Sequence, residues 1–352
     1  MKIIHTADIH LGSKIERKLD REKSEERKRE VRTAFDKIID YARKEGVSAI
    51  ILAGDVFDSV RPLKKDKEFF YNAVKANENI DFLYLRGNHD VLESYTENLP
   101  NLKTFEKTWT SYAYGNVVIT GAELCGDNFS SAYSTLSLKK DDINVVTLHG
   151  QIPDGAGENL INLKKLKDKN IDYLALGHIH SYKSGTIDGR GEWAYPGCPE
   201  GRGFDETGAK GFILLDVNGD KIEKKFIENS IRKINDVSVD VSGAKDVYTA
   251  GTIVKERIDF NKNDLYRIRL TGEISFDAEG IEKDVAAMLA PRAYYITVKD
   301  ETVIKTDISD YEGDVSVRGE FIRKVLNSDY TPEEKQAVIT CGLKALAGRE
   351  DI

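Results

Sequence analysis

The first part of the chain alternates short apolar runs with amphipathic segments whose apolar residues recur at helical spacing. The pattern predicts strands over residues 2–6, 48–53 and 81–85, and helices over 31–45 and 63–76. Buried strands that alternate with such helices are typical of a layered α/β fold, and not of a helix bundle or a β-sandwich.

After residue 115 the pattern changes to strands without long helices between them. Asn218-Gly219 joins the last two strand-like runs and is a strong hairpin signature. Two sheets packed face to face, with helices outside them, would accommodate these segments. The predicted strands are 116–120, 143–148, 173–176, 182–187, 192–195 and 211–217.

The α/β pattern starts again near residues 229–240 and predicts a second, smaller α/β domain with its own core. Two helices follow, over 316–326 and 331–346, and Thr331-Pro332-Glu333-Glu334 gives the second one a cap-like start. We therefore expect three parts. They are 1–233, a smaller α/β domain over 234–312, and C-terminal helices over 313–352.

Composition narrows the class of protein. With 352 residues, of which 40% are apolar and 32% charged, the chain is expected to be globular and neither disordered nor membrane-spanning. His5 and Asp8 fall where a signal peptide would need apolar residues, so we expect a cytoplasmic protein. Its three cysteines (Cys125, Cys198, Cys341) are too few and too scattered for a disulfide framework or a zinc cage.

The net charge of −8 argues at first against a nucleic-acid partner, because phosphate binding relies on Lys and Arg. Binding depends on local potential, however, and residues 13–32 hold nine Lys or Arg against six Asp or Glu. The Lys and Arg residues of this segment could contact phosphates, or the part over 23–32 could be a solvated helix with internal ion pairs. The candidate DNA contacts are Lys14, Arg17, Arg61, Arg86 and Arg202, with the Lys64-Lys65 pair beside them.

Polar residues of metal-ligand type follow five of the predicted strands. Taken alone, each segment could be explained as an ordinary turn or as a core histidine whose ring nitrogens are hydrogen-bonded. Together, however, the segments contain five of the six histidines. Loops at the carboxyl ends of strands gather the site of an α/β protein. The segments are Asp8-Ile9-His10, Gly54-Asp55, Gly87-Asn88-His89-Asp90, His149-Gly150 and Gly177-His178-Ile179-His180.

These side chains are carboxylates, a carboxamide and imidazoles, without a thiolate. That set suits a dinuclear site for borderline-hard metals. Two metals about 3.5 to 4 Å apart need a bridging anion, and Asp55 can give one oxygen to each. Imidazoles ligate only when neutral, so we expect metal affinity to fall as the pH drops through about 6.5.

In their order along the chain these motifs resemble those of the calcineurin-like metallophosphoesterases. The stretches HTADIHLG, GDVFDSVRP and GHIH resemble more specifically the SbcD branch, a family of DNA double-strand-break repair nucleases. The resemblance covers about residues 1–225. It implies a four-layer α/β/β/α sandwich, and beyond it the chain resembles that branch only in layout, a small α/β capping domain followed by helices.

The resemblance also implies roles for individual residues. Asp55 would bridge two divalent metals, with manganese the implied ion, although the ligand types also permit iron, zinc or cobalt. His89 would face the scissile phosphate and protonate the leaving sugar oxygen. Asp58 would orient His89, or it would be a simple turn residue. His5 is given no catalytic role. The implied ligands are Asp8, His10, Asp55 and His180 for one metal, and Asp55, Asn88, His149 and His178 for the other.

The partners implied by the resemblance are DNA and a separate SbcC-like coiled-coil ATPase, since the chain has no GxxxxGK[ST] phosphate loop. The terminal helices could contact that ATPase or pack on the capping domain. Whether the protein forms a homodimer is left open, and no interaction with a membrane is expected. The loop over 195–204 would border the site, with Cys198 and Arg202 facing substrate.

The leading hypothesis is therefore a metal-dependent DNA nuclease of the SbcD type, acting as an exonuclease or endonuclease in the processing and repair of DNA ends. One alternative is a phosphatase or phosphodiesterase for small substrates. The other is a DNA-end tether whose site is structural.

Overall fold

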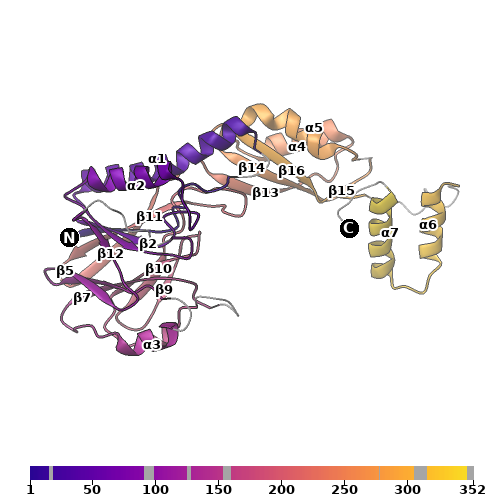
Figure 1. Cartoon of the computed structure of the whole chain (residues 1–352). Helices are drawn as coiled ribbons and strands as arrows, with labels where there is room; N and C mark the ends of the chain where they lie inside the picture. The colour runs from indigo at the N-terminus through magenta and orange to yellow at the C-terminus, as the bar shows by residue number, and fades with distance from the viewer. Residues whose placement is uncertain are drawn as a thin grey trace. The chain divides into compact units, whose positions relative to one another are not determined.

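The structure of this protein is a computed structural model that describes residues 1–15, 19–90, 99–124, 128–153, 160–276, 278–304 and 315–346. Arg17 and Cys125 lie outside the described residues. The chain divides into two compact units, Met1–Ile234 and Asn235–Ile352. Figure 1 shows the elements of both.

The first unit contains two six-stranded sheets. In the first sheet β1 to β4 run parallel, while β11 and β12 form a hairpin whose β11 pairs antiparallel with β1. The turn lies after Asn218, as predicted, with Gly219 at φ 60°. The sheet order is β12 (Lys221–Glu228), β11 (Gly211–Asn218), β1 (Lys2–Thr6), β2 (Ala49–Ala53), β3 (Asp81–Leu85) and β4 (Leu102–Thr104).

The second sheet has a parallel centre made of β6, β7, β8 and β10, with an antiparallel strand at each edge. Its edge strand β5 was not predicted from the sequence. The order is β5 (Thr110–Tyr114), β6 (Val117–Gly121), β7 (Ile143–His149), β8 (Tyr173–Gly177), β10 (Glu192–Tyr195) and β9 (Lys183–Thr186).

One apolar cluster fills the space between the two sheets. Ile3 and Ile51 of the first sheet belong to the same buried cluster as Ile119 and Val145 of the second. Alternate residues point to the other face of the first sheet, where Phe70 packs against Phe35 and Tyr84. The two sheets therefore lie face to face.

Helices cover the outer faces of this double sheet, α1 (Arg21–Glu45) and α2 (Lys64–Lys75) on one side and α3 (Asn128–Thr135) on the other (Figure 1). A second apolar cluster joins Tyr133 and Leu136 to Val146 and Leu174 of the second sheet. The predicted α/β/β/α layering is confirmed.

Helix α1 begins ten residues before the predicted start. Asp20 caps it by accepting a hydrogen bond of 2.8 Å from Lys23 N, and Gly46 ends it with φ 64°. Arg27 is fully buried and pairs with Glu200 at 2.8 Å, as well as with Glu30. The charged residues over 23–32 thus lie on a helix, but it is not solvated on every side.

The second unit is a smaller α/β body followed by a helical hairpin. Strands β13, β14 and β16 form its sheet, β15 pairs with β17, and α4 and α5 complete a core that includes Ile268 and Leu270. The elements are β13 (Ile234–Asp240), α4 (Val247–Arg257), β14 (Leu265–Thr271), β15 (Glu273–Ile274), α5 (Ile281–Leu289), β16 (Tyr295–Asp300), β17 (Val303–Ile304), α6 (Val317–Leu326) and α7 (Pro332–Leu346).

The cap-like start of α7 is a reciprocal capping box. Thr331 N donates to Glu334 at 2.8 Å, and Glu334 N donates back to the Thr331 hydroxyl at 3.3 Å. Helices α6 and α7 share a small apolar cluster built from Ile322, Val325 and Ile339. In the part of the chain that is described, no helix is both long enough and apolar enough to cross a membrane.

Candidate metal centre

The loops that follow β1 and β2 run side by side and bring the first predicted ligands together. Asp8 N donates to Gly54 O at 3.0 Å, and His10 N donates to Asp55 O at 3.0 Å. Parallel neighbouring strands end at the same edge of a sheet, so polar residues directly after them meet there. Backbone hydrogen bonds thus fix Asp8, His10 and Asp55 beside one another.

Backbone strain concentrates at these positions. Among the described residues, six that are not glycine have a positive φ, and four of the six are predicted ligands: Asp8, His10, Asp55 and His178. Such a conformation costs roughly 1 to 3 kcal/mol at each position and persists only where the surrounding structure imposes it. The fold therefore holds these side chains in directions that relaxed loops would not give them.

One group of candidate ligands consists of Asp8, His10 and His180, whose ligand atoms all lie within 4.8 Å of one another. The Nε2 atoms of His10 and His180 are 3.2 Å apart. Two imidazole nitrogens bound to one ion at roughly 2.1 Å each would stand at about this separation. Asp8 is held in place by the His178 N–H, which donates to both carboxylate oxygens.

The other group consists of Asp55, His149 and His178, again with ligand atoms within 4.8 Å. His149 Nε2 lies 3.4 Å from Asp55 Oδ2, and the His149 and His178 rings meet edge to face at 5.3 Å between centroids. Asp55 and His149 are buried, while His178 is partly exposed. This group is thus shielded from solvent on the side of Asp55 and His149.

Asp55 lies between the two groups. The same oxygen, Oδ2, is 3.4 Å from His149 Nε2 and 3.9 Å from His10 Nε2. Its other oxygen accepts a hydrogen bond of 2.9 Å from the backbone N–H of His89. A Cβ on Gly87 would stand 2.2 Å from Oδ1, so only glycine lets this carboxylate sit there. Asp55 is thus a carboxylate close to both groups.

Two of the histidines fit a divalent cation because their Nδ1 atoms are already engaged. His149 Nδ1 lies 2.9 Å from the carbonyl of Ala53, and His180 Nδ1 lies 2.8 Å from Glu206 Oε1 and 3.1 Å from Arg202 Nη2. The carbonyl and the carboxylate only accept, so a neutral ring with its proton on Nδ1 turns the Nε2 lone pair to the centre. Buried His149 Nε2 has no hydrogen-bond partner in the described structure. A metal ion bound at the centre would satisfy this nitrogen.

The charges of the site act on one another. Burial by itself lowers the pKa of His149, but the nearby Asp55 carboxylate outweighs it and raises this pKa to about 9. Burial raises the pKa of Asp55, whereas His149 and the His89 N–H hold it well below its usual range. Without metal the two therefore form an ion pair, and a metal ion must displace the His149 proton.

His5 differs from the other buried histidines. Both of its ring nitrogens have partners, the Tyr173 hydroxyl at 2.9 Å and the Leu176 carbonyl at 3.2 Å. Burial lowers its pKa to about 3, so it is neutral at physiological pH. These contacts are those of a packed core histidine.

The segment after β3 carries Asn88 and His89, and both are exposed. The backbone beneath them is fixed by Asp90, whose carboxylate accepts from the N–H groups of Phe57 at 2.9 Å and Gly87 at 3.0 Å. The His89 ring lies edge to face with His10, 5.4 Å between centroids. A rigid backbone thus presents two open side chains beside the candidate ligands.

Asp58 contacts a different histidine from the one predicted. Its Oδ1 lies 3.1 Å from His10 Nδ1 and 3.0 Å from Arg202 Nη1. The contacts described for Asp58 are thus those of a residue that orients His10. Its assignment to His89 stays a prediction.

The candidate substrate contacts divide into exposed cations and cations paired with carboxylates. Lys14 and Arg61 are exposed, whereas Arg86 forms a two-pronged ion pair with Glu123. Arg202 is mostly buried and pairs with Glu206 and Asp58. These pairs hold the guanidinium groups of Arg86 and Arg202 on protein carboxylates.

Cys198 does not face a substrate, contrary to the sequence-based expectation. Its side chain is buried, 1% exposed, with Sγ 3.6 Å from Glu206 Oε2. Burial raises the pKa of this thiol well above its usual range, so the thiol stays protonated and unreactive.

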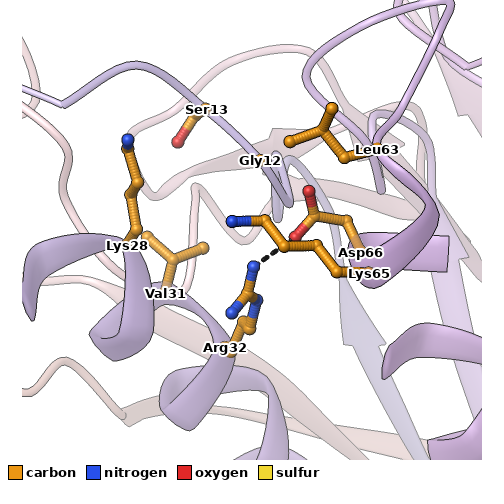
Figure 2. Close-up of a pocket in the computed structure, with 8 residues that line it drawn as sticks. All are labelled: Gly12, Ser13, Lys28, Val31, Arg32, Leu63, Lys65 and Asp66. Atoms are coloured by element: carbon orange, nitrogen blue, oxygen red, sulfur yellow. Dashed lines mark hydrogen bonds and ion pairs between the residues drawn. The ribbon is translucent and has the colours of Figure 1, made fainter. Parts of the chain in front are cut away.

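A small cavity lies beside the first loop (Figure 2). Arg32 pairs with Asp66 at 2.5 Å on its wall, and Lys28 and Lys65 flank it. Its volume of about 40 Å³ suits a few water molecules, which would satisfy the otherwise unpartnered Ser13 hydroxyl. The cavity is too small for a nucleotide.

Two buried residues of the site, Glu206 and Lys210, have no role that the sequence predicted. Glu206 is 3% exposed and holds His180, and Lys210 is 2% exposed and donates to the His180 carbonyl at 2.7 Å. The only sequence indication was the i, i+4 spacing of Arg202 and Glu206, which is common on any charged loop or helix. Their role depends on contacts between segments far apart in the chain.

Comparison with known proteins shows the family to which the chain belongs. The family model "Calcineurin-like phosphoesterase" matches residues 1–182, so the chain belongs to the calcineurin-like phosphoesterases. Enzymes of this family hydrolyse phosphoesters at a dinuclear metal site. The predicted membership of the calcineurin-like metallophosphoesterases is confirmed. The predicted enzyme class, a hydrolase, is confirmed as well.

Individual relatives are more distant. The chain is 25% identical to the "DNA double-strand break repair protein Mre11" of Sulfolobus acidocaldarius, over 100% of both chains. It is also 25% identical to the "Uncharacterized metallophosphoesterase YhaO" of Bacillus subtilis, over 73% of this chain and 67% of that protein. A solved dimetal phosphatase from Danio rerio is 12% identical with a TM-score of 0.45, over 65% of this chain and 99% of that one.

Proposed function

We propose that this protein is a metal-dependent DNA nuclease of the SbcD type that hydrolyses phosphodiester bonds in the processing of DNA ends. The observation that carries the proposal is the pair of ligand groups joined by Asp55 beside the exposed His89. The full-length similarity to an archaeal DNA double-strand break repair protein supports DNA as the substrate.

In this proposal Asp8, His10 and His180 hold one divalent ion and His149 and His178 the other, with Asp55 shared and Asn88 completing the second set. Bound metals would activate the attacking water and neutralise charge on the phosphate. The fixed Nδ1 contacts of His180 and His149 keep Nε2 free for ligation.

His89 would supply the proton for the leaving oxygen. Its backbone N–H is fixed on Asp55 while its ring stays open to solvent, so the ring can reach a bound phosphodiester. A neighbouring imidazole of this kind typically contributes a rate factor of about 10² to 10⁴.

The charge distribution is compatible with DNA binding at the first unit. Residues 1–234 carry 36 Lys or Arg and 37 Asp or Glu, whereas residues 235–352 carry 16 and 23. Nearly all of the net negative charge therefore belongs to the second unit. Lys14 and Arg61 are exposed and are proposed as phosphate contacts.

Manganese is the proposed metal, because the set of carboxylate, carboxamide and imidazole ligands suits it and the resemblance implies it. An SbcC-like ATPase is the proposed partner, with helices α6 and α7 as its contact. Val317 at the start of α6 is 73% exposed, and Tyr330 just before α7 is 52% exposed.

The test is a cleavage assay on metal-loaded protein with manganese, using duplex DNA, single-stranded DNA and a small chromogenic phosphodiester. We expect cleavage of DNA, and a loss of about 10² to 10⁴-fold in rate for His89→Ala with metal stoichiometry unchanged. Hydrolysis of the small ester without any action on DNA would indicate the small-substrate alternative. Metal binding with no hydrolysis at all would indicate a tether.

A further inference from the structure

Behind the first ligand group lies a set of charged side chains that the catalytic proposal does not use. It consists of Asp58, Arg202 and Glu206. Glu206 is 3% exposed and Arg202 is 14% exposed, so both groups are largely removed from water. Charged groups this far from solvent persist only where they are paired, and each of these is paired toward the metal ligands.

The two carboxylates hold the two histidines of the same group. Glu206 Oε1 lies 2.8 Å from His180 Nδ1, and Asp58 Oδ1 lies 3.1 Å from His10 Nδ1. The Glu206 contact is an aligned hydrogen bond, while the Asp58 contact is close but not aligned. Each ring is thus backed by a carboxylate on the side away from its ligand atom.

Arg202 joins these two carboxylates. Its Nη1 donates to Asp58 Oδ1 at 3.0 Å, and its Nε donates to Glu206 Oε1 at 3.0 Å. The Arg202 backbone N–H also donates to Glu206 Oε2 at 2.8 Å. Only a planar guanidinium, with donors on opposite edges, can hold two carboxylates at fixed directions in this way.

The loop that carries Arg202 is itself fixed to helix α1. Buried Arg27 donates to the carbonyl of Gly201 and pairs with Glu200 at 2.8 Å. The backbone next to Arg202 is therefore held in place by Arg27, which lies 174 positions before Gly201 in the sequence.

In the part of the chain that the structure describes, the second ligand group shows no such device. His149 Nδ1 is backed by the Ala53 carbonyl, a neutral acceptor. Among the described contacts of His149 and His178, no carboxylate stands behind either ring. The two halves of the centre thus differ in how their histidines are oriented.

We propose that Arg202 is a positioning residue for one metal only, the ion held by Asp8, His10 and His180, and that it acts by fixing Asp58 and Glu206 against the two histidines. This inference rests on the proposed metal centre. It replaces the substrate-binding role that the sequence suggested for Arg202 with an internal one. Loss of such an outer contact typically lowers metal affinity by about 10 to 100-fold.

The decisive experiment is a manganese(II) titration of metal-free, full-length protein, followed by electron paramagnetic resonance and calorimetry. Wild-type protein is expected to bind two manganese ions with the spectrum of a coupled pair. Arg202→Gln should lower the affinity for one ion about 10 to 100-fold and leave the other within about 3-fold. At limiting manganese its spectrum should be that of an isolated ion.

A second measurement needs no metal. Long-range nitrogen–proton spectra report which ring nitrogen of a histidine is protonated. In wild-type protein His180 and His10 should be Nδ1–H tautomers, and Arg202→Gln or Glu206→Gln should mix the tautomers of His180 while His149 stays unchanged. If Arg202 had only a general structural role, its loss would not change the tautomers of His180 while leaving those of His149 unchanged.

Arg190→Gln is the matched control. Arg190 also forms a two-pronged pair, with Asp172 at 2.9 and 2.8 Å, but at the edge of the second sheet where its parallel strands begin. It should leave both manganese affinities unchanged. Arg202→Lys keeps the charge without the planar fork, so it should restore less than half of the lost affinity.

The proposal is overturned if Arg202→Gln weakens both ions equally, or neither, in protein that keeps its circular dichroism spectrum. Should Arg202→Gln fail to fold, Glu206→Gln and Arg202→Lys decide by the same criterion. A wild-type protein that binds fewer than two manganese ions removes the metal centre and this inference with it. Two bound ions without DNA cleavage would overturn only the proposed nuclease, and leave the role of Arg202 standing.

Discussion

The two units of this chain use buried charge in opposite ways. Many charged or titratable side chains are buried in the first unit, including Asp8, Arg27, Asp55, Glu200 and Glu206. In the described part of the second unit, Asp264 is the buried charged residue, and the core is made of Val, Ile, Leu and Ala together with Tyr266. Burying a charge costs free energy unless it is paired or binds a metal.

The comparison shows what each unit is built to do. The first unit accepts desolvated charges and strained backbone because they fix the directions of ligand side chains. The second gains its stability mainly from apolar burial. Changes in the two units should therefore have different consequences, and three substitutions test this.

Asp55→Ala should have the largest effect. Removing the carboxylate between the two ligand groups takes a ligand from both metals, so both should be lost and cleavage should fall by at least about 1000-fold, or about 4 kcal/mol in activation free energy. Metal analysis of the dialysed protein and the rate of DNA cleavage measure this. Two bound metals in the variant would show that Asp55 is not the bridge.

Ile268→Ala should have the reverse pattern. Ile268 is fully buried in the core of the second unit, and the cavity left behind should lower the free energy of unfolding by about 3 kcal/mol. Metal stoichiometry should stay at two ions. Denaturant unfolding followed by circular dichroism gives the stability, with Ile268→Val as a milder control at about 1 kcal/mol. Loss of metal in folded Ile268→Ala would contradict the division of roles.

The smallest expected effect is the pH dependence that His5 contributes. Its folded pKa is about 3, against 6.5 in the unfolded chain, so only the unfolded state takes up this proton as the pH falls below 6.5. The free energy of unfolding should therefore fall by about 1.5 kcal/mol between pH 6.5 and pH 5. Unfolding of metal-free protein at several pH values measures it.

His5→Gln is the control, because glutamine can donate to the Leu176 carbonyl and accept from the Tyr173 hydroxyl but does not titrate. The pH dependence of its stability should be smaller than that of wild-type protein by this amount. An unchanged dependence would show that His5 is not held neutral by the core.

Much of the local structure followed from the pattern of residues. The strands over 2–6, 81–85 and 192–195 are found at those bounds, because short apolar runs between turn residues leave few alternatives. Helix α1 was predicted ten residues too short. Its first turns carry charged residues that become buried only through partners such as Glu200, which lies 173 positions from Arg27.

The sequence by itself determined the family, the layered α/β fold and the placement of ligand-type residues directly after strands. Those properties depend on local order, on apolar periodicity and on the rule that parallel strands end at one edge. The tertiary structure decided which ligands share a group, that Asp58 lies against His10, and that Arg202 and Glu206 stand behind the histidines. These are choices among side-chain partners up to about 170 residues apart, and only the folded chain selects among them.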